Sequence, residues 1–312
     1  DALRSGSLKL TDQVTISEHA WRVGGAGSTG STSFLPINSQ ASVEVLLRGM
    51  IVQSGNDASI ALAERVAGSE DAFSQLLNGY SKRLGMTGTN FENSTGLPGP
   101  NHFTTAYDMA LLAAAIVRDF PQYYHYYAEK QYTHNGITQQ NRNGLLYRDP
   151  AVDGLKTGHT ESAGYCLVSS AKRGDQRLVS VVMGTASMKA REDASMALLN
   201  YGFSFFQPHT VLSAGQSLGT LRVWQGAENQ TTAIAKSALI IAVPRGRAQD
   251  VQTKVELPAS IAAPITEDKP IGKVSAMLDG KALASLPLYS QKAIPQAGLF
   301  GRMFDSVRMK FE

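Results

Sequence analysis

Cysteine is almost absent from this chain, because Cys166 is the single cysteine among 312 residues. An internal disulfide is therefore impossible, although this does not fix the compartment, since many exported proteins have none. The chain also lacks any run of five basic residues, and its net charge is only +3, so nucleic-acid binding is not indicated. No stretch approaches the roughly 18 apolar residues that a membrane-spanning helix needs.

Metal and cofactor motifs are missing as well. The six histidines show no metal-ligand spacing, and a single cysteine argues against a zinc site. The glycine-rich stretch "GGAGSTGSTS" at 24–33 lacks the following lysine of a phosphate-binding loop, so we interpret it as a flexible surface loop. The sequence therefore predicts no metal and no cofactor.

Apolar residues make up 43% of the chain, enough for a substantial core in one large or two ordinary domains. Residues 41–66 predict two helices separated by "SGN", because apolar residues recur at helical spacing along one face. Further helices are predicted at 71–84, closed by Gly85, and at 105–120, with Thr105 as N-cap. A loop rich in Gly, Asn, Pro and Thr joins them over 86–104.

The second half of the chain has the texture of β-structure. Residues 153–184 predict three short strands, and 188–206 predict a helix. Short alternating runs over 209–294 indicate a small all-β domain, with Asp279-Gly280 as a hairpin turn. The last stretch, "PQAGLFGRMFDSVRMKFE", is helical again.

The tripeptide Lys156-Thr157-Gly158 lies on the first predicted strand. A lysine charge, a hydroxyl and a glycine that permits close approach suit the binding of an extended peptide along a strand edge. The alternative is an ordinary exposed lysine before a turn.

Two further candidates have similar alternatives. In Ser54-Gly55-Asn56, the serine can relay a proton and the asparagine amide can hold a substrate amide. The alternative is a helix junction, in which Gly55 ends one helix and Asn56 or Asp57 caps the next. Arg191 could bind a carboxylate bidentately or could be a solvated helix residue.

Taken together, these motifs resemble those of the low-molecular-mass penicillin-binding proteins that act as serine-type D-alanyl-D-alanine carboxypeptidases. Ser-Gly-Asn and Lys-Thr-Gly occur in that order, and their surroundings extend the match: "GMIVQSGNDASIALAERVAGS", "NRNGLLYRDPAVDGLKTGHTESAGYCLVSS" and "VPRGR". The resemblance runs through nearly all of the chain. It implies an α/β transpeptidase/β-lactamase-like domain, with a helical cluster and an antiparallel sheet, then a small all-β domain and a C-terminal amphipathic helix.

The resemblance also implies domain limits and partners. Residues 1–207 would form the penicillin-binding domain, 208–295 a β-rich stalk and 296–312 a membrane-associating helix. The partners would be peptidoglycan stem peptides, β-lactam antibiotics and a membrane surface. The protein would be periplasmic and peripherally attached to the inner membrane.

The family's site residues can be carried over by position. Ser54, Asn56 and Lys156 would be catalytic, with Lys156 supporting proton transfer. Thr157 and Arg191 would hold the substrate's terminal carboxylate. Gly158 and His159 would also bind the substrate, with the His159 N–H as one of two donors to the oxyanion. Arg142 lies in a shared segment, but the resemblance assigns it no firm role.

One element of the family pattern is missing, namely the Ser-x-x-Lys motif that carries the nucleophile upstream of the first helix pair. The only literal match, Ser169 to Lys172, follows Lys-Thr-Gly and lies in a predicted strand, where positions i and i+3 point to opposite faces. We interpret it as chance and expect that the chain begins downstream of its nucleophile. The alternative function is a degenerate, non-catalytic family member that binds cell-wall peptides.

The C-terminal segment predicts an amphipathic helix lying on an anionic membrane. Its apolar stripe consists of residues at i, i+3, i+4, i+7 and i+11, namely Phe300, Met303, Phe304, Val307 and Phe311. Three basic residues lie off the stripe, Arg302, Arg308 and Lys310. The alternative is a helix packed on the β domain.

The missing motif yields a prediction for residues 1–312 by themselves. Incubation with a fluorescent penicillin should give no covalent labelling, because Ser54 is expected to have no activating base within reach. Labelling that survives denaturation would contradict this. Mass-spectrometric mapping would then begin with Ser54 and Ser169.

Overall fold

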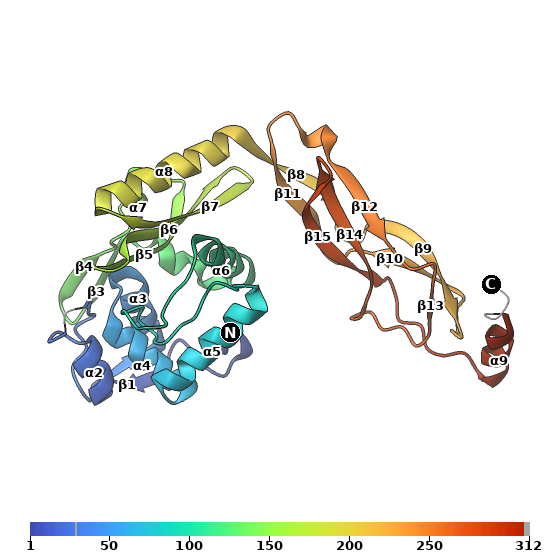
Figure 1. Ribbon diagram of the computed structural model, residues 1–312. Helices are drawn as coiled ribbons and strands as arrows, with labels where there is room; N and C mark the ends of the chain where they lie inside the picture. The colour runs from blue at the N-terminus through green and yellow to red at the C-terminus, as the bar shows by residue number, and fades with distance from the viewer. Residues whose placement is uncertain (29, 309–312) are drawn as a thin grey trace. The chain divides into compact units, whose positions relative to one another are not determined.

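The computed structural model describes residues 1–28 and 30–308, which fall into two compact units, Asp1–Phe203 and Ser204–Glu312 (Figure 1). The first unit contains an antiparallel three-stranded sheet in the order β5–β6–β7 and two small two-stranded sheets, β1–β2 and β3–β4. The strands are β1 (Gln13–Thr15), β2 (Gln40–Ser42), β3 (Gln131–His134), β4 (Ile137–Gln140), β5 (Val152–Thr160), β6 (Gly164–Arg173) and β7 (Gln176–Thr185).

Helices surround this sheet. They are α1 (Ala2–Ser5), α2 (Glu18–Gly24), α3 (Val43–Gln53), α4 (Asn56–Ala67), α5 (Glu70–Leu84), α6 (Ala106–Asp119), η1 (Pro121–Ala128), α7 (Leu145–Arg148) and α8 (Met188–Phe205). Figure 1 shows α7 and α8 along one side of the sheet and α3–α6 on the other.

Alternation along the strands supplies both faces of the sheet with apolar side chains. On one face, Leu167 and Ala171 of β6 pack with Leu199 of α8. On the other face, Val168 of β6 packs with Ala113 of α6. The sheet is therefore buried between two helical layers.

The helical layer has its own core around α3 and α4, in which Leu46 and Ile60 are fully buried. The sequence pattern predicts one apolar face for each helix, but every residue of α4 from 56 to 63 is buried. Alanines at 58, 61 and 63 make this possible, because small side chains let neighbouring elements approach α4 from all sides.

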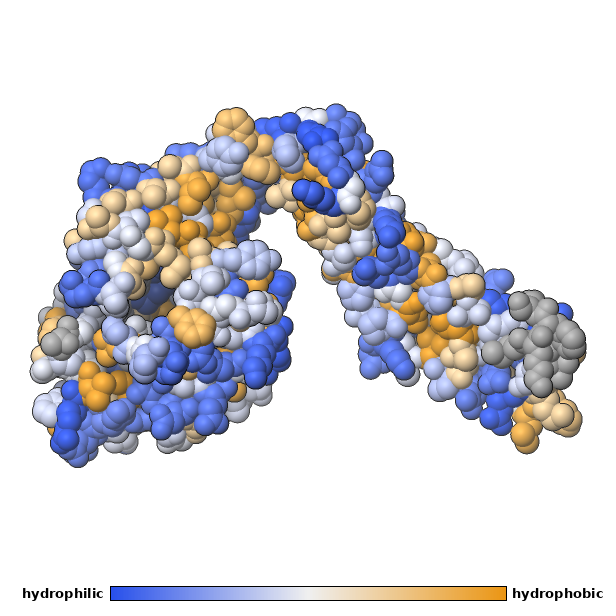
Figure 2. Space-filling model, in the orientation of Figure 1, coloured by the Kyte–Doolittle hydropathy of each residue, from blue (hydrophilic) through white to orange (hydrophobic). Residues whose placement is uncertain are grey.

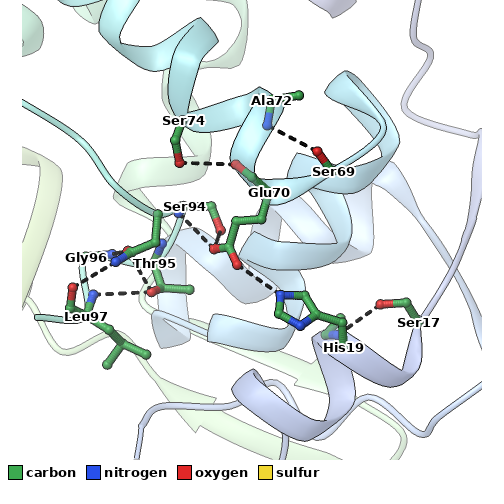
Figure 3. A network of polar contacts seen from close by, with 12 residues as sticks. Ser17, His19, Ser69, Glu70, Ala72, Ser74, Ser94, Thr95, Gly96 and Leu97 are labelled. Carbon is green, nitrogen blue, oxygen red and sulfur yellow. Dashed lines mark hydrogen bonds and ion pairs between the residues drawn. The ribbon is translucent and has the colours of Figure 1, made fainter. Parts of the chain in front are cut away.

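Glu70, the first residue of α5, ties three segments of this layer together (Figure 3). Its carboxylate accepts hydrogen bonds from the Ser94 N–H at 2.9 Å and the Ser94 hydroxyl at 2.6 Å, and it contacts His19 Nε2 of α2 at 3.1 Å. Figure 3 shows the carboxylate pointing between the two partners. The loop over 86–104 and helix α2 are thereby fastened to the start of α5.

After α8 ends at Phe205, the described part of the second unit is β-structure apart from a short 3₁₀ turn, η2 (Ala248–Asp250), and the last helix. A six-stranded sheet has the order β12–β14–β15–β10–β9–β13, and the β8–β11 ribbon packs its apolar residues against it. The strands are β8 (Phe206–Leu212), β9 (Ser217–Trp224), β10 (Gln230–Ile234), β11 (Leu239–Pro244), β12 (Gln252–Glu256), β13 (Ser260–Ala262), β14 (Pro270–Leu278) and β15 (Lys281–Ser290).

The last helix, α9 (Leu299–Arg308), contacts the β unit through polar residues. Asp305 and Ser306 are bonded to the N–H and the side-chain amide of Gln225, at the end of β9. Phe300 and Met303 are 91% and 68% exposed, and Figure 2 shows hydrophobic surface over this helix. Phe311 of the predicted stripe and the basic residue Lys310 lie outside the described residues, as does the side chain of Val307.

Among the described residues, no helix has the length and apolar character needed to cross a membrane.

The structure confirms the predicted fold class, the helices within 41–66 and 105–120, the three strands of 153–184 and the Asp279-Gly280 turn, whose two residues have φ of 51° and 75°. The sequence did not predict the short helices α1, α2, α7 and η1 or the strand pairs β1–β2 and β3–β4. Each of these strands has only three or four residues, too few for alternation to stand out from a loop.

Candidate active site

Ser54 occupies the junction between α3 and α4. It is the C-cap of α3 in the left-handed region, with φ 63° and ψ 32°, while Gly55 is the N-cap of α4. A non-glycine residue costs roughly 1 kcal/mol in this conformation. Such outliers gather at functional sites, where surrounding packing imposes them. The helix-junction interpretation of Ser-Gly-Asn is therefore correct in outline, although serine rather than glycine ends α3.

Lys156 of β5 reaches this junction from the sheet. Its Nζ donates a hydrogen bond to Ser54 Oγ and another, of 3.1 Å, to the Thr157 carbonyl. The two motifs lie 102 residues apart in the sequence, and the fold brings them into direct contact. Lys156 is half-buried, so it is not the ordinary exposed lysine of the alternative interpretation.

Burial, reinforced by the nearby charges of Arg142 and Arg191, lowers the pKa of Lys156 to about 7. A substantial fraction of this lysine is then neutral near pH 7 and can accept a proton from a hydroxyl. The expectation that Ser54 has no base within reach is therefore wrong. The Lys156 amine lies within hydrogen-bond reach of the Ser54 hydroxyl, and only the tertiary fold brings the two side chains together.

Arg191 of α8 is 2% exposed, which excludes the solvated-residue alternative. Its Nη1 donates to the carbonyls of Gly158 and Cys166 at 3.2 and 3.4 Å, and its Nη2 donates to the Arg142 carbonyl at 3.4 Å. Burial lowers the pKa of this guanidinium. Arg191 thus joins β5, β6 and the 142 segment and places a positive charge behind the Lys-Thr-Gly strand.

Arg142 is exposed, unlike Lys156 and Arg191, and the sequence alone could not predict this environment. Its neighbours Asn141 and Asn143 are buried and donate side-chain bonds to the carbonyls of Glu129 and Gly154, at 2.9 and 3.0 Å. These anchors leave the Arg142 side chain exposed and without an ion pair to any described residue. The signal in the sequence was the "NRN" pattern, two amides flanking one arginine.

Thr157, Gly158 and His159 follow Lys156 along β5, which is the edge strand of the sheet. Gly158 and His159 are exposed and Thr157 is half-buried. The His159 ring packs on Tyr165 of β6, with centroids 4.0 Å apart. An exposed edge strand presents backbone groups to which an extended peptide can pair.

Asn56 follows Ser54 by two residues and begins α4. It is 7% exposed, and its N–H donates to the Ser31 carbonyl at 2.8 Å. The structure thus collects all the predicted site residues at one place, where the α3–α4 junction meets the edge of the sheet.

The literal Ser-x-x-Lys match does not belong to this site. Ser169 is fully buried in β6 and shares a 2.7 Å hydrogen bond with Ser180, whereas Lys172 is exposed. Their opposite environments are those of strand positions i and i+3, so the geometry excludes a serine–lysine pair.

Comparison with known proteins identifies the class to which this fold and site belong. Residues 1–187 match the D-alanyl-D-alanine carboxypeptidase family, and 206–296 match the penicillin-binding protein 5 C-terminal domain. The D-alanyl-D-alanine carboxypeptidase DacC of Escherichia coli is 42% identical over 99% of this chain and 78% of the relative. DacA of Haemophilus influenzae is 43% identical over 97% of this chain and 78% of the relative.

A solved structure agrees with these relatives. The crystal structure of penicillin binding protein 5 from Haemophilus influenzae superposes with a TM-score of 0.81 and 42% identity, over 95% of this chain and 86% of that one. The chain therefore belongs to the family of serine-type D-alanyl-D-alanine carboxypeptidases, which confirms the resemblance drawn from its motifs.

The lowered pKa of Lys156 predicts a pH dependence of stability. Between about 7 in the folded protein and 10.5 in the unfolded chain, the folded state binds fewer protons. The free energy of unfolding should therefore rise with pH across this window, by at most about 1.4 kcal/mol per pH unit, and fall as the pH drops back toward 7. Lys156→Met should remove this rise in the free energy of unfolding, as measured by urea unfolding at several pH values.

Lys172→Met, at an exposed lysine of β6, is the matched control and should keep the wild-type slope. Equal slopes in the wild type and in Lys156→Met would contradict the prediction.

Proposed function

We propose that this protein removes the terminal D-Ala from peptidoglycan stem pentapeptides in the periplasm and is acylated by β-lactams at the same site. The hydrogen bond from Lys156 to Ser54 supports this proposal most strongly. It pairs a lysine of near-neutral pKa with a hydroxyl at a strand edge, the arrangement that proton transfer in acyl transfer requires.

The substrate peptide would pair along β5, with its terminal carboxylate near the Thr157 hydroxyl and the exposed Arg142. Arg191 would act from behind the strand, since its buried guanidinium is bonded to the Gly158 carbonyl. The basic side chains of Arg142, Lys156 and Arg191 gather here, and among the described residues no acidic side chain pairs with Arg142 or Lys156. Their combined charge favours the binding of an anionic group. The Asn56 amide would hold a substrate amide, and the His159 N–H would donate to the developing oxyanion.

In the reaction, a serine oxygen would attack the carbonyl of the penultimate D-Ala. The peptide C–N bond would break, and the amine of the terminal D-Ala would leave with a proton. Water would then hydrolyse the ester, returning the proton to the serine. Ser54 and Lys156 would relay these protons.

Replacing the site lysine tests this function. In the full-length gene product, Lys156→Ala should lower the rate of acylation by fluorescent penicillin at least about 100-fold, because proton transfer through Ser54 is lost. Lys172→Ala should keep the wild-type rate. Unchanged acylation in Lys156→Ala would remove Lys-Thr-Gly from the mechanism. A wild-type protein that binds stem peptides without any acylation would support the non-catalytic alternative.

We further propose that α9 attaches the protein peripherally to the inner membrane. Its polar residues Asp305 and Ser306 face the β unit, which leaves its large apolar side chains free to enter a lipid interface. This arrangement is the opposite of that expected for a helix packed on the β domain through its apolar stripe.

Vesicle flotation tests the attachment. Deletion of residues 298–312, or the pair Phe300→Ser and Phe304→Ser, should abolish binding to anionic vesicles, since apolar burial supplies the affinity. Leu283→Ser, at an apolar residue of β15 that is 45% exposed, is the control and should bind like the wild type. Binding that survives both changes in α9 would refute the proposal.

A further inference from the structure

The glycine-rich stretch 24–33 is exposed at Ala26 and Gly27, but its two ends are not the surface loop that the composition suggests. Gly24, Gly25, Thr32 and Ser33 are buried. The segment lies against the start of α4, where the Ser31 carbonyl accepts the Asn56 N–H. It therefore supplies part of the N-terminal cap that Gly55, which has no side chain, cannot provide.

Glycines in this stretch permit a very close approach to the site. A Cβ at Gly30 would lie 2.2 Å from the Asn56 side-chain nitrogen. A Cβ at Gly24 would lie 2.2 Å from the Asp57 backbone nitrogen. Both distances are far below van der Waals contact, so any larger residue would push Asn56 or its helix turn away.

Asp57 fastens the following residues to the same turn. Its carboxylate is fully buried and accepts from the Thr32 hydroxyl at 2.8 Å, from the Ser33 N–H at 2.8 Å and from the Leu35 N–H at 3.1 Å. It also accepts from the Ala58 N–H at 2.9 Å. No described lysine or arginine pairs with this anion, so hydrogen-bond donors alone compensate its burial.

We propose that Asp57 is a positioning residue of the active site. By holding residues 32–35, its carboxylate keeps the glycine-rich segment pressed on Asn56 and so fixes the direction of the Asn56 amide. Asp57 does not touch the substrate and acts through Asn56. The inference rests on the proposed function, because it assigns Asn56 a role in binding the substrate amide.

The first test is a double-mutant cycle on penicillin acylation in the full-length gene product. Asp57→Asn replaces an acceptor oxygen with a donor and should slow acylation roughly 10- to 100-fold, as small misplacements of a catalytic group do. In an Asn56→Ala background, Asp57→Asn should slow acylation by less than about threefold, because the Asn56 amide through which Asp57 acts is absent. Equal effects in both backgrounds would overturn the proposal.

Asp108→Asn is the matched control for stability. Asp108 is a buried carboxylate in the first turn of α6 that accepts from the Gly88 N–H and the Thr89 hydroxyl, and it contacts none of residues 54–56. It should lower the melting temperature without slowing acylation by the folded protein. If Asp108→Asn slowed acylation as much as Asp57→Asn, a general loss of stability would explain both and the proposal would fail.

The second test does not depend on Asp57 and decides the matter if Asp57→Asn fails to fold. Gly30→Ala should slow acylation about tenfold or more, because the added methyl displaces the Asn56 amide. Gly27→Ala lies in the same segment with no atom within 4 Å of the added carbon and should have no effect. Normal acylation by Gly30→Ala would overturn the inference, whereas a wild-type protein that is not acylated would overturn the proposed function itself.

Discussion

The contact between Lys156 and Ser54 is the constraint around which the first unit is organised. It joins the edge strand β5 to the junction of the buried helices α3 and α4. Ser54 is fixed as the C-cap of α3, and Lys156 is held within β5. Ser54 adopts a left-handed conformation that costs free energy, and Lys156 gives up part of its hydration. Core packing of α3, α4 and β5 must offset both costs, so the site depends on the integrity of the whole layer.

Electrostatics complete this arrangement. Arg191 lies behind the strand, Arg142 lies exposed beside it, and Lys156 lies between the strand and the helix junction. Desolvation, reinforced by repulsion from the two arginines, lowers the pKa of the lysine, while the same arginine charges favour an anionic ligand. One cluster of basic side chains thus combines a lysine of lowered pKa with a positive field that favours an anion, which agrees with membership of a D-alanyl-D-alanine carboxypeptidase family.

A recurring device holds the loops of this unit. Asp57, Glu70 and Asp108 lie in the first turns of α4, α5 and α6, and each carboxylate accepts N–H and hydroxyl donors from a loop distant in the sequence. The partial positive charge at a helix N-terminus favours an anion there, so the acid stabilises its helix and the loop together. The positions of these loops are therefore set by the helices that form the core.

The sequence by itself determined α3 to α6, α8 and the strands β5 to β7, because burial of one face of an element imposes a local apolar period along the chain. Ser54, Asn56 and Lys156 could be named because Ser-Gly-Asn and Lys-Thr-Gly resemble the motifs of the penicillin-binding family. Only the tertiary structure decided that Lys156 touches Ser54, that Arg191 is buried while Arg142 is exposed, and that the glycine-rich stretch packs on Asn56. These facts depend on strand order, on the path of the loops and on desolvation. All three arise only when segments about 25 to 100 residues apart are brought together, so they leave no periodic pattern in the sequence.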